Sequence, residues 1–209
     1  MSEIKDKSVQ FFLDELASKA PTPGGGSAAA VMGATSAALT SMVCNLTIGK
    51  AEYARVESDM QSLLIQSESL RAKLTDLIKA DVDVFNRLMA CYRLPKQTDQ
   101  EKKARTQEIQ VALKEATDIP LNCARACAEA IAMSREAAKN GNINAVSDAG
   151  VAVMSGYAGL KSAALNVYIN VRGIKDKAFV DSRLADLEQI LLSADVATEE
   201  IYQGVKNKL

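Results

Sequence analysis

The sequence contains no histidine and no tryptophan, and only 4% of its 209 residues are aromatic. A chain without histidine has no Ser-His-Asp or Cys-His catalytic group of its own, and no histidine ligand for zinc. Acid–base chemistry in this chain therefore has to use carboxylate, lysine, tyrosine or thiol groups.

The sequence also has no excess of one charge and no secretory features. Its net charge of −1 is unlike that of nucleic-acid-binding proteins. The N-terminus has no apolar signal core, and the four cysteines, Cys44, Cys91, Cys123 and Cys127, lack the spacing of a disulfide scaffold. Residues 27–47 are apolar but interrupted by Ser, Thr and Asn, which argues against a membrane span. We expect a cytoplasmic protein with reduced, buried cysteines and with neither a nucleic-acid nor a membrane partner.

What is present favours helix along almost the whole chain. Hydrophobic residues make up 48% and charged residues 24%, as in ordinary globular proteins. Apolar positions recur at helical spacing over residues 3–18, 28–47, 53–92, 98–139, 142–172 and 176–206. We predict one all-α domain over residues 1–209, an antiparallel bundle with long helices.

Some details of these helices can also be predicted. The first helix should turn Val9, Phe12, Leu13 and Leu16 inward. Thr98 and Glu101 have the spacing of a capping box at the start of the fourth helix. Pro120 should kink or divide that helix, since proline has no backbone N–H to donate.

The helix over residues 53–92 carries one carboxylate where an apolar residue belongs. Leu70, Leu74, Leu77, Phe85 and Leu88 form an apolar stripe, and Asp81 lies on the same line, whereas Asp83 points away from it. A charged group on a core-facing line is costly unless it is paired, hydrogen-bonded or protonated. Asp81 is therefore either a functional site or one partner of a buried ion pair.

A glycine-rich segment, Pro-Thr-Pro-Gly-Gly-Gly-Ser at 21–27, precedes the second helix. Free amide groups and the positive end of the helix dipole allow such a segment to hold an anion. The segment lacks the Lys-Ser/Thr ending of a P-loop, and no strand precedes it. The alternative is a plain loop and helix cap.

The fifth helix combines small residues with amides. Its glycines indicate that a helix or a ligand packs very close to it. Asn144, Ser147 and Asp148 stand at its start, where they either cap the helix or belong to a site. Asn166 and Asn170 stand one turn apart beside apolar residues, which favours hydrogen bonds to something buried.

Together these segments resemble the formiminotetrahydrofolate cyclodeaminase family. The resemblance rests on Pro-Thr-Pro-Gly-Gly-Gly-Ser-Ala-Ala at 21–29, Asp81 with Phe85, Ser-Asp-Ala-Gly-Val at 147–151 and Ala-Leu-Asn-Val at 164–167. It covers essentially the whole chain. Residues 41–50 and 93–96 make the chain most similar to stand-alone bacterial members of the family. Such members hydrolyse 5,10-methenyltetrahydrofolate reversibly to 10-formyltetrahydrofolate.

The resemblance implies an all-helical homodimer that binds a folate substrate in a cleft and needs no other cofactor and no metal. It implies that Asp81 is the catalytic acid–base group and stabilises the cationic substrate. Amides and backbone groups are candidates for binding the pterin, and Lys50 for binding a glutamate tail. The candidate substrate-binding residues are Pro23, Gly24, Gly25, Gly26, Ser27, Asn45, Lys50, Asn144, Ser147, Asp148, Asn166 and Asn170.

Two other functions stay open at this point. The chain could act as a formiminotetrahydrofolate cyclodeaminase, which closes the same ring and releases ammonia through a similar tetrahedral carbon. It could also be a non-catalytic helical dimer, with Asp81 in an internal ion pair and the small-residue helices as the contact between copies.

Overall fold

The computed structural model describes residues 3–209, and all of the secondary structure in this range is helical, which confirms the all-α prediction. The helices are η1 (Ile4–Asp6), α1 (Val9–Leu16), α2 (Gly25–Asn45), η2 (Ala51–Val56), α3 (Glu57–Tyr92), α4 (Asp99–Asn140), η3 (Ile143–Ala145), α5 (Val146–Val171) and α6 (Lys177–Lys206).

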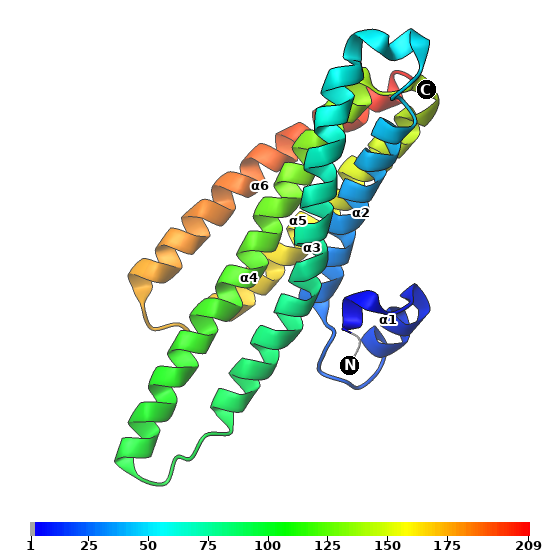
Figure 1. Cartoon of the computed structure of the whole chain (residues 1–209). Coiled ribbons are helices and arrows are strands. Elements are labelled where there is room, and N and C mark those ends of the chain that lie inside the picture. The colour runs from blue at the N-terminus through cyan, green and yellow to red at the C-terminus, as the bar shows by residue number, and fades with distance from the viewer. Residues whose placement is uncertain (1–2) are drawn as a thin grey trace.

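The helices from α2 to α6 lie side by side, and each runs antiparallel to the one before it (Figure 1). Cross-helix contacts fix the register. Ser41 and Ser67 are hydrogen-bonded between α2 and α3, and the Tyr157 hydroxyl donates to Asp195 between α5 and α6. The main hydrophobic core draws buried residues from α2, α3, α4, α5 and α6.

The glycines of α2 and α5 allow these two helices to pack almost backbone to backbone. A Cβ added at Gly159 would lie 2.9 Å from the Ala29 carbonyl oxygen and 3.0 Å from the Gly33 nitrogen. At Gly33 it would lie 2.7 Å from the Cys127 sulfur of α4. The close neighbour predicted for these glycines is therefore a helix of the same chain.

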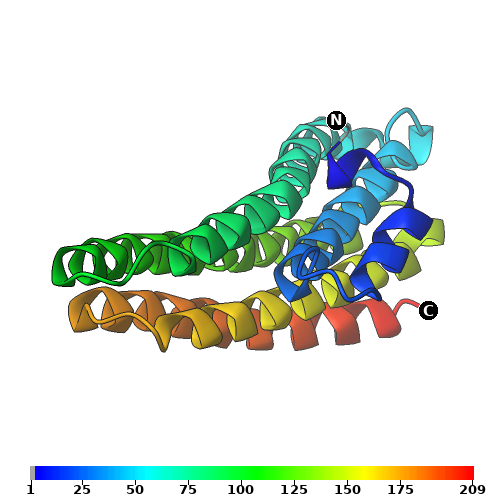
Figure 2. The same ribbon diagram turned by 90° about the horizontal axis from the view of Figure 1, so that it is seen from below.

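The second helix, α2, starts partway along the bundle, and α3 and α4 continue well beyond its first residue (Figures 1 and 2). A second, smaller hydrophobic cluster fills this extension between α3 and α4. It consists of Leu88, Cys91, Ile109, Ala112, Leu113 and Ala116, with Val84 and Ile174 packed against it. The N-terminus of α2 consequently lies in the middle of the molecule.

The N-terminal segment differs from its prediction. The expected single helix is broken, because Ser8 accepts a hydrogen bond from the Phe11 amide and caps a new helix, α1. Phe12 packs against the core as predicted, but Val9 is 77% and Leu13 51% exposed, so their inward assignment was wrong. No residue of α1 is buried.

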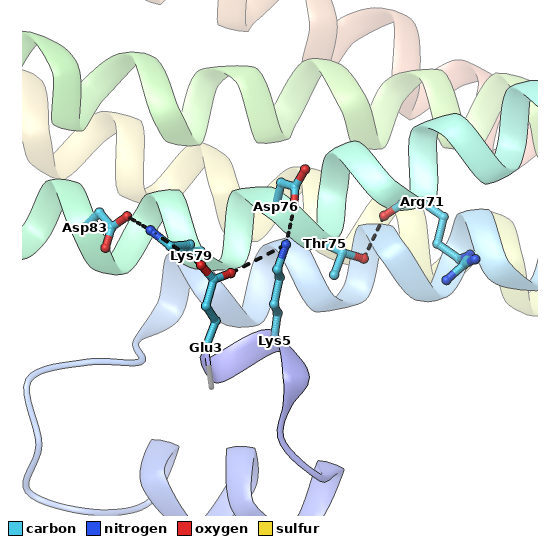
Figure 3. Close-up of polar contacts among 7 residues, drawn as sticks. All are labelled: Glu3, Lys5, Arg71, Thr75, Asp76, Lys79 and Asp83. Carbon is cyan, nitrogen blue, oxygen red and sulfur yellow. Dashed lines mark hydrogen bonds and ion pairs between the residues drawn. The ribbon is translucent and has the colours of Figure 1, made fainter. Parts of the chain in front are cut away.

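Ion pairs attach the segment before α1 to the outer side of α3. Lys5 Nζ lies 2.5 Å from Asp76 Oδ1, and Glu3 approaches Lys79 at 4.0 Å (Figure 3). The same Lys79 pairs with Asp83 (Figure 3). Ile4 packs against the main core, so η1 is fixed to the bundle on the side of α3 that carries these charges.

Helix α4 begins as predicted and does not divide where expected. The Thr98–Glu101 capping box is present. Pro120 lies inside a continuous helix of 42 residues. Proline cannot donate to the carbonyl four residues back, that of Ala116. The Asn170 side chain of α5 donates to this oxygen at 2.6 Å instead, which satisfies the group that Pro120 leaves free.

All four cysteines are buried and unpaired, as predicted. Within residues 3–209, α2 is the one helix whose length and composition would suffice to cross a membrane, and 56% of its most apolar window lies inside the protein.

Candidate functional site

The carboxylate of Asp81 lies against the first turn of α2. The Ser27 hydroxyl donates a hydrogen bond of 2.8 Å to Asp81 Oδ2. The other oxygen, Oδ1, lies so close to Gly26 that a Cβ there would be 2.1 Å away. The N-cap residue of α2 is Gly24, which has no side chain to offer. Asp81 therefore supplies the negative charge at the positive end of α2 from a different helix.

No lysine or arginine within the described part of the chain pairs with Asp81. The nearest lysine along α3, Lys79, is paired with Asp83 and approaches Glu3. Asp83 is exposed on the outside of α3, as predicted. The alternative prediction, in which Asp81 is one partner of a buried ion pair, was wrong. Hydrogen bonds and a helix terminus stabilise its charge.

Two opposing effects set the protonation of Asp81. Burial raises the pKa of its carboxyl, and hydrogen bonds from the Ser27 hydroxyl and backbone amide oppose the rise. No neighbouring charge contributes to the shift. The residue is half-buried, so a ligand can reach it from solvent. Such a carboxyl is suited to accepting and returning a proton.

Several other predicted residues lie near Asp81. Pro23 and Ser27 are buried in the segment that leads into α2, and a Cβ added at Gly25 would lie 3.7 Å from the Asn166 side-chain nitrogen. Asn166 donates to the Ser162 carbonyl of its own helix. Asn170, one turn further on, donates to the Ala116 carbonyl, which gives this amide a structural role in the fold.

The remaining predicted residues lie at the opposite end of α2. They belong to the last turn of α2, the loop after it, η3 and the start of α5, and they are Asn45, Lys50, Asn144, Ser147 and Asp148. The Asn142 side chain donates to the Leu46 carbonyl and so holds these segments together. Since α2 has 21 residues, this far group lies about 30 Å from the Asp81 end. A single chain does not bring the two groups together.

None of Asn144, Ser147 and Asp148 is the N-cap residue of α5. The N-cap of α5 is Ala145, which makes no side-chain hydrogen bond to the helix. Asp148 lies in the first turn of α5, as predicted, where a carboxylate favours the helix dipole. Asn144, Ser147 and Lys50 are exposed and available to a ligand or a second chain.

One residue that the site prediction left out is Phe85. It lies one turn beyond Asp81 on the same side of α3 and is half-buried, yet it packs against neither hydrophobic cluster. An aromatic ring beside Asp81 offers a surface to a flat, cationic ligand. Its place in the apolar stripe of α3, one turn after Asp81, is the sequence signal that could have identified it. Within residues 3–209, no group of three or more Cys, Asp or Glu side chains is placed to hold a metal ion.

The chain is similar to known proteins over most of its length. Residues 8–189 match the family model described as formiminotransferase-cyclodeaminase. The methenyltetrahydrofolate cyclohydrolase of Methylorubrum extorquens is 55% identical over 98% of both chains. The formimidoyltransferase-cyclodeaminase of rat is 32% identical over 91% of this chain, which corresponds to 35% of the rat protein.

A solved structure is similar over nearly the full length as well. The crystal structure of formiminotetrahydrofolate cyclodeaminase from Thermotoga maritima is 33% identical and gives a TM-score of 0.85, covering 99% of this chain and 98% of that one. The helices that carry Asp81, Gly24–Ser27 and Asn166 fall inside the matched range of the family model. The chain belongs to the formiminotransferase-cyclodeaminase family.

Proposed function

We propose that this protein is a methenyltetrahydrofolate cyclohydrolase, which hydrolyses 5,10-methenyltetrahydrofolate reversibly to 10-formyltetrahydrofolate. The main support is its 55% identity, along the full length, to the M. extorquens protein of that name. The unpaired carboxylate at the N-terminus of α2 provides the acid–base group that this reaction needs.

The chemistry follows from the substrate. The methenyl carbon between N5 and N10 is part of an amidinium-like cation and is the electrophile. Water forms a C–O bond to this carbon while one of its protons passes to Asp81. The neutral adduct then breaks its C–N5 bond as Asp81 returns that proton to N5. The hydroxyl of the adduct loses its proton as the formyl C=O forms, so one proton is released overall.

The surroundings of Asp81 support both of its proposed roles. A carboxylate without a partner cation attracts the substrate's positive charge, and this charge in turn favours ionised Asp81. Burial acts in the opposite direction and keeps the pKa of the carboxyl raised. The group is therefore able to accept a proton from water and to return it to nitrogen. Positioned acid–base catalysis of this kind contributes roughly 10²–10⁴-fold.

A second candidate activity is that of a formiminotetrahydrofolate cyclodeaminase. It is supported by the T. maritima structure, whose title gives that activity. In that reaction N10 attacks a formimino carbon and ammonia leaves, again through a tetrahedral carbon between two nitrogens. The same carboxylate can serve either reaction, so substrate assays are needed to separate them.

The decisive experiment compares Asp81→Asn with Asp83→Asn in both assays. Loss of the methenyl chromophore measures hydrolysis, and ammonia release measures deamination. We expect the parent protein to hydrolyse the methenyl substrate and Asp81→Asn to lose at least about 100-fold of that rate. Asp83 is exposed and paired with Lys79, so Asp83→Asn should retain full activity.

Thermal unfolding of the same variants tests the electrostatics. Since its pKa in the fold lies above its unfolded value, ionised Asp81 costs folding free energy at neutral pH, and this cost disappears as the pH falls below the raised pKa. Asp81→Asn should therefore leave Tm at neutral pH unchanged or raise it. Activity of the parent protein with neither substrate would instead support a non-catalytic helical protein.

We also propose that the protein works as a homodimer. Large apolar side chains stay exposed along one side of α5, and we call these four residues, Val151, Met154, Leu165 and Ile169, the α5 stripe. A cavity of about 650 Å³ adjoins the stripe, and most of the residues that line it are apolar. Exposed apolar surface of this kind typically marks an interaction site.

A second copy is the partner that fits the two ends of the site. The α5 stripe extends from the far group, near Asp148, to the Asp81 end, near Asn166. A two-fold axis perpendicular to α5 would bring opposite ends of the two chains together along this stripe. Lys50 of one copy would then approach the Asp81 end of the other, where it can bind a folate glutamate tail.

The proposed reaction needs no metal and no redox cofactor, because the substrate itself carries the positive charge that a Lewis acid would supply. We further propose a cytoplasmic location, which is consistent with four buried and unpaired thiols.

A further inference from the structure

The hydrogen bond between Ser27 and Asp81 has features that packing alone does not require. Ser27 is completely buried, lies in the first turn of α2, and directs its hydroxyl at an atom 54 residues away in the sequence. Several other buried hydroxyls of this protein, those of Thr40, Thr117 and Ser134, donate to the carbonyl four residues back in their own helix. Ser27 instead bonds to the carboxylate of the proposed catalytic residue.

The contacts divide the two oxygens of Asp81 between two tasks. Ser27 binds Oδ2, while Oδ1 occupies the space that a side chain at Gly26 would fill and has no side-chain hydrogen bond within residues 3–209. One oxygen is thus held by a side chain, and the other has no side-chain partner. A hydroxyl can also reverse its role: it donates to a carboxylate and accepts from a carboxylic acid.

We infer that Ser27 is a positioning residue for the reaction, which keeps Asp81 Oδ1 directed at the substrate through both protonation states of the carboxyl. The Ser27 hydroxyl donates to Oδ2 while Asp81 is ionised. Once Oδ1 has taken the proton of water, the carboxyl stays in place with its proton available to N5. This inference rests on the proposed function and adds a second residue to its mechanism.

The charges around Asp81 allow a clean test by pH. Helix α2, which packs against Asp81, contains no acidic or basic side chain, and Asn166 of α5, which lies near Gly25, is neutral. Lys5 of η1 and the charged groups in the neighbouring turns of α3 are paired as Lys5–Asp76 and Lys79–Asp83, and the remaining charged residue of η1, Asp6, acts on Lys5. Ser27 is therefore the main polar influence on the carboxyl.

The experiment measures kcat/KM for the methenyl substrate against pH in the parent, Ser27→Ala, Ser27→Thr and Ser36→Ala. Ser27→Ala removes the hydrogen bond that favours the ionised Asp81 carboxylate, so a larger fraction of Asp81 is protonated at a given pH. We expect the acidic limb of the profile to move to higher pH and kcat/KM to fall roughly 10- to 100-fold, as for loss of a hydrogen bond to a charged group. Ser27→Thr keeps a hydroxyl and should restore the limb.

Ser36→Ala is the matched control. Ser36 lies on the same helix, is completely buried, and its hydroxyl has no hydrogen-bond partner. We expect its profile to match that of the parent. The position of the limb does not depend on how much protein is folded, so poor folding of a variant leaves the test intact.

The outcomes separate this inference from the proposed function. If Ser27→Ala keeps the parent's limb and rate while Asp81→Asn is inactive, Ser27 is not a positioning residue, although Asp81 still catalyses. If Asp81→Asn is itself active, the proposed mechanism fails and the role of Ser27 fails with it.

Discussion

At the scale of single residues, the site depends on a carboxylate that replaces a missing helix cap. Helices commonly begin with a side chain that accepts hydrogen bonds from their first amides, and α2 begins with glycine. Asp81 takes that place from α3 and remains half-buried. A conventional N-cap on α2 would satisfy the helix without Asp81 and would compete with it for the same amides.

From this arrangement we expect Gly26 to matter more for activity than for stability. An alanine Cβ at Gly26 would lie 2.1 Å from Asp81 Oδ1, but the Asp81 side chain is flexible and can rotate away. We expect Gly26→Ala to change the free energy of unfolding by less than about 1 kcal/mol and to lower kcat/KM on the order of 100-fold, because the base is misplaced. Denaturant unfolding and steady-state kinetics measure the two effects.

Gly204→Ala on α6 is the comparison for Gly26. No atom lies within 4 Å of the Cβ that it would add. It should stabilise the fold by about 1 kcal/mol without a change in rate. Full activity in Gly26→Ala would contradict the assigned position of Asp81.

The sequence identified Asp81 because a charge interrupted an apolar stripe, and it distinguished Asp83 by its phase on the helix. It did not reveal what holds Asp81, because its partner Ser27 lies 54 residues away. Helical periodicity describes one helix at a time, and a tertiary hydrogen bond leaves no periodic trace. The alternative prediction, that Asp81 is one partner of a buried ion pair, was wrong for the same reason.

At the scale of helices, the start and end signals were informative. The capping box at Thr98 agrees with the structure. Val9 and Leu13 were assigned wrongly, because an amphipathic pattern shows which face is apolar but not whether anything covers it. The predicted division at Pro120 was wrong, because the group that compensates for the proline, Asn170, belongs to another helix.

The link between Pro120 and Asn170 leads to a coupling prediction. Asn170→Ala leaves the Ala116 carbonyl without a donor and should destabilise the protein by about 1–3 kcal/mol. In the Pro120→Ala background the helix recovers its own N–H donor, so the same Asn170→Ala change should cost less than half as much. A double-mutant cycle from denaturant unfolding measures this difference. Equal costs in both backgrounds would show that Asn170 stabilises the fold by other contacts.

At the scale of the whole molecule, the two groups of predicted site residues lie at opposite ends of α2, with the α5 stripe beside it. The sequence motifs could not reveal this separation, since residues far apart in sequence were grouped by chemistry alone. A site divided in this way needs either a long ligand or a second chain. The exposed apolar side chains of α5 favour the second chain.

The proposed dimer predicts that a charge introduced in the α5 stripe weakens association, whereas a charge introduced on α3 does not. Val151 is 53% exposed on α5 and Ile65 is 73% exposed on α3, away from the α5 stripe. Val151→Glu should shift the protein from dimer to monomer in sedimentation velocity, because a buried unpaired carboxylate is costly at an interface. Turnover should fall with the dimer if the far group of the partner binds substrate.

Ile65→Glu should leave both the sedimentation of the dimer and the turnover unchanged. Thermal melts serve as a check that both variants are folded. A parent protein that sediments as a monomer at assay concentrations would rule out the proposed assembly.

The enclosure of all four cysteines has a practical consequence. Cys44, Cys91, Cys123 and Cys127 come from three different helices, and all four are buried in the native fold. A single cysteine introduced at an exposed position can therefore carry a fluorescent or spin label without removal of the native thiols. Under conditions that open the bundle, the rate at which these thiols are alkylated measures how often each helix separates from its neighbours.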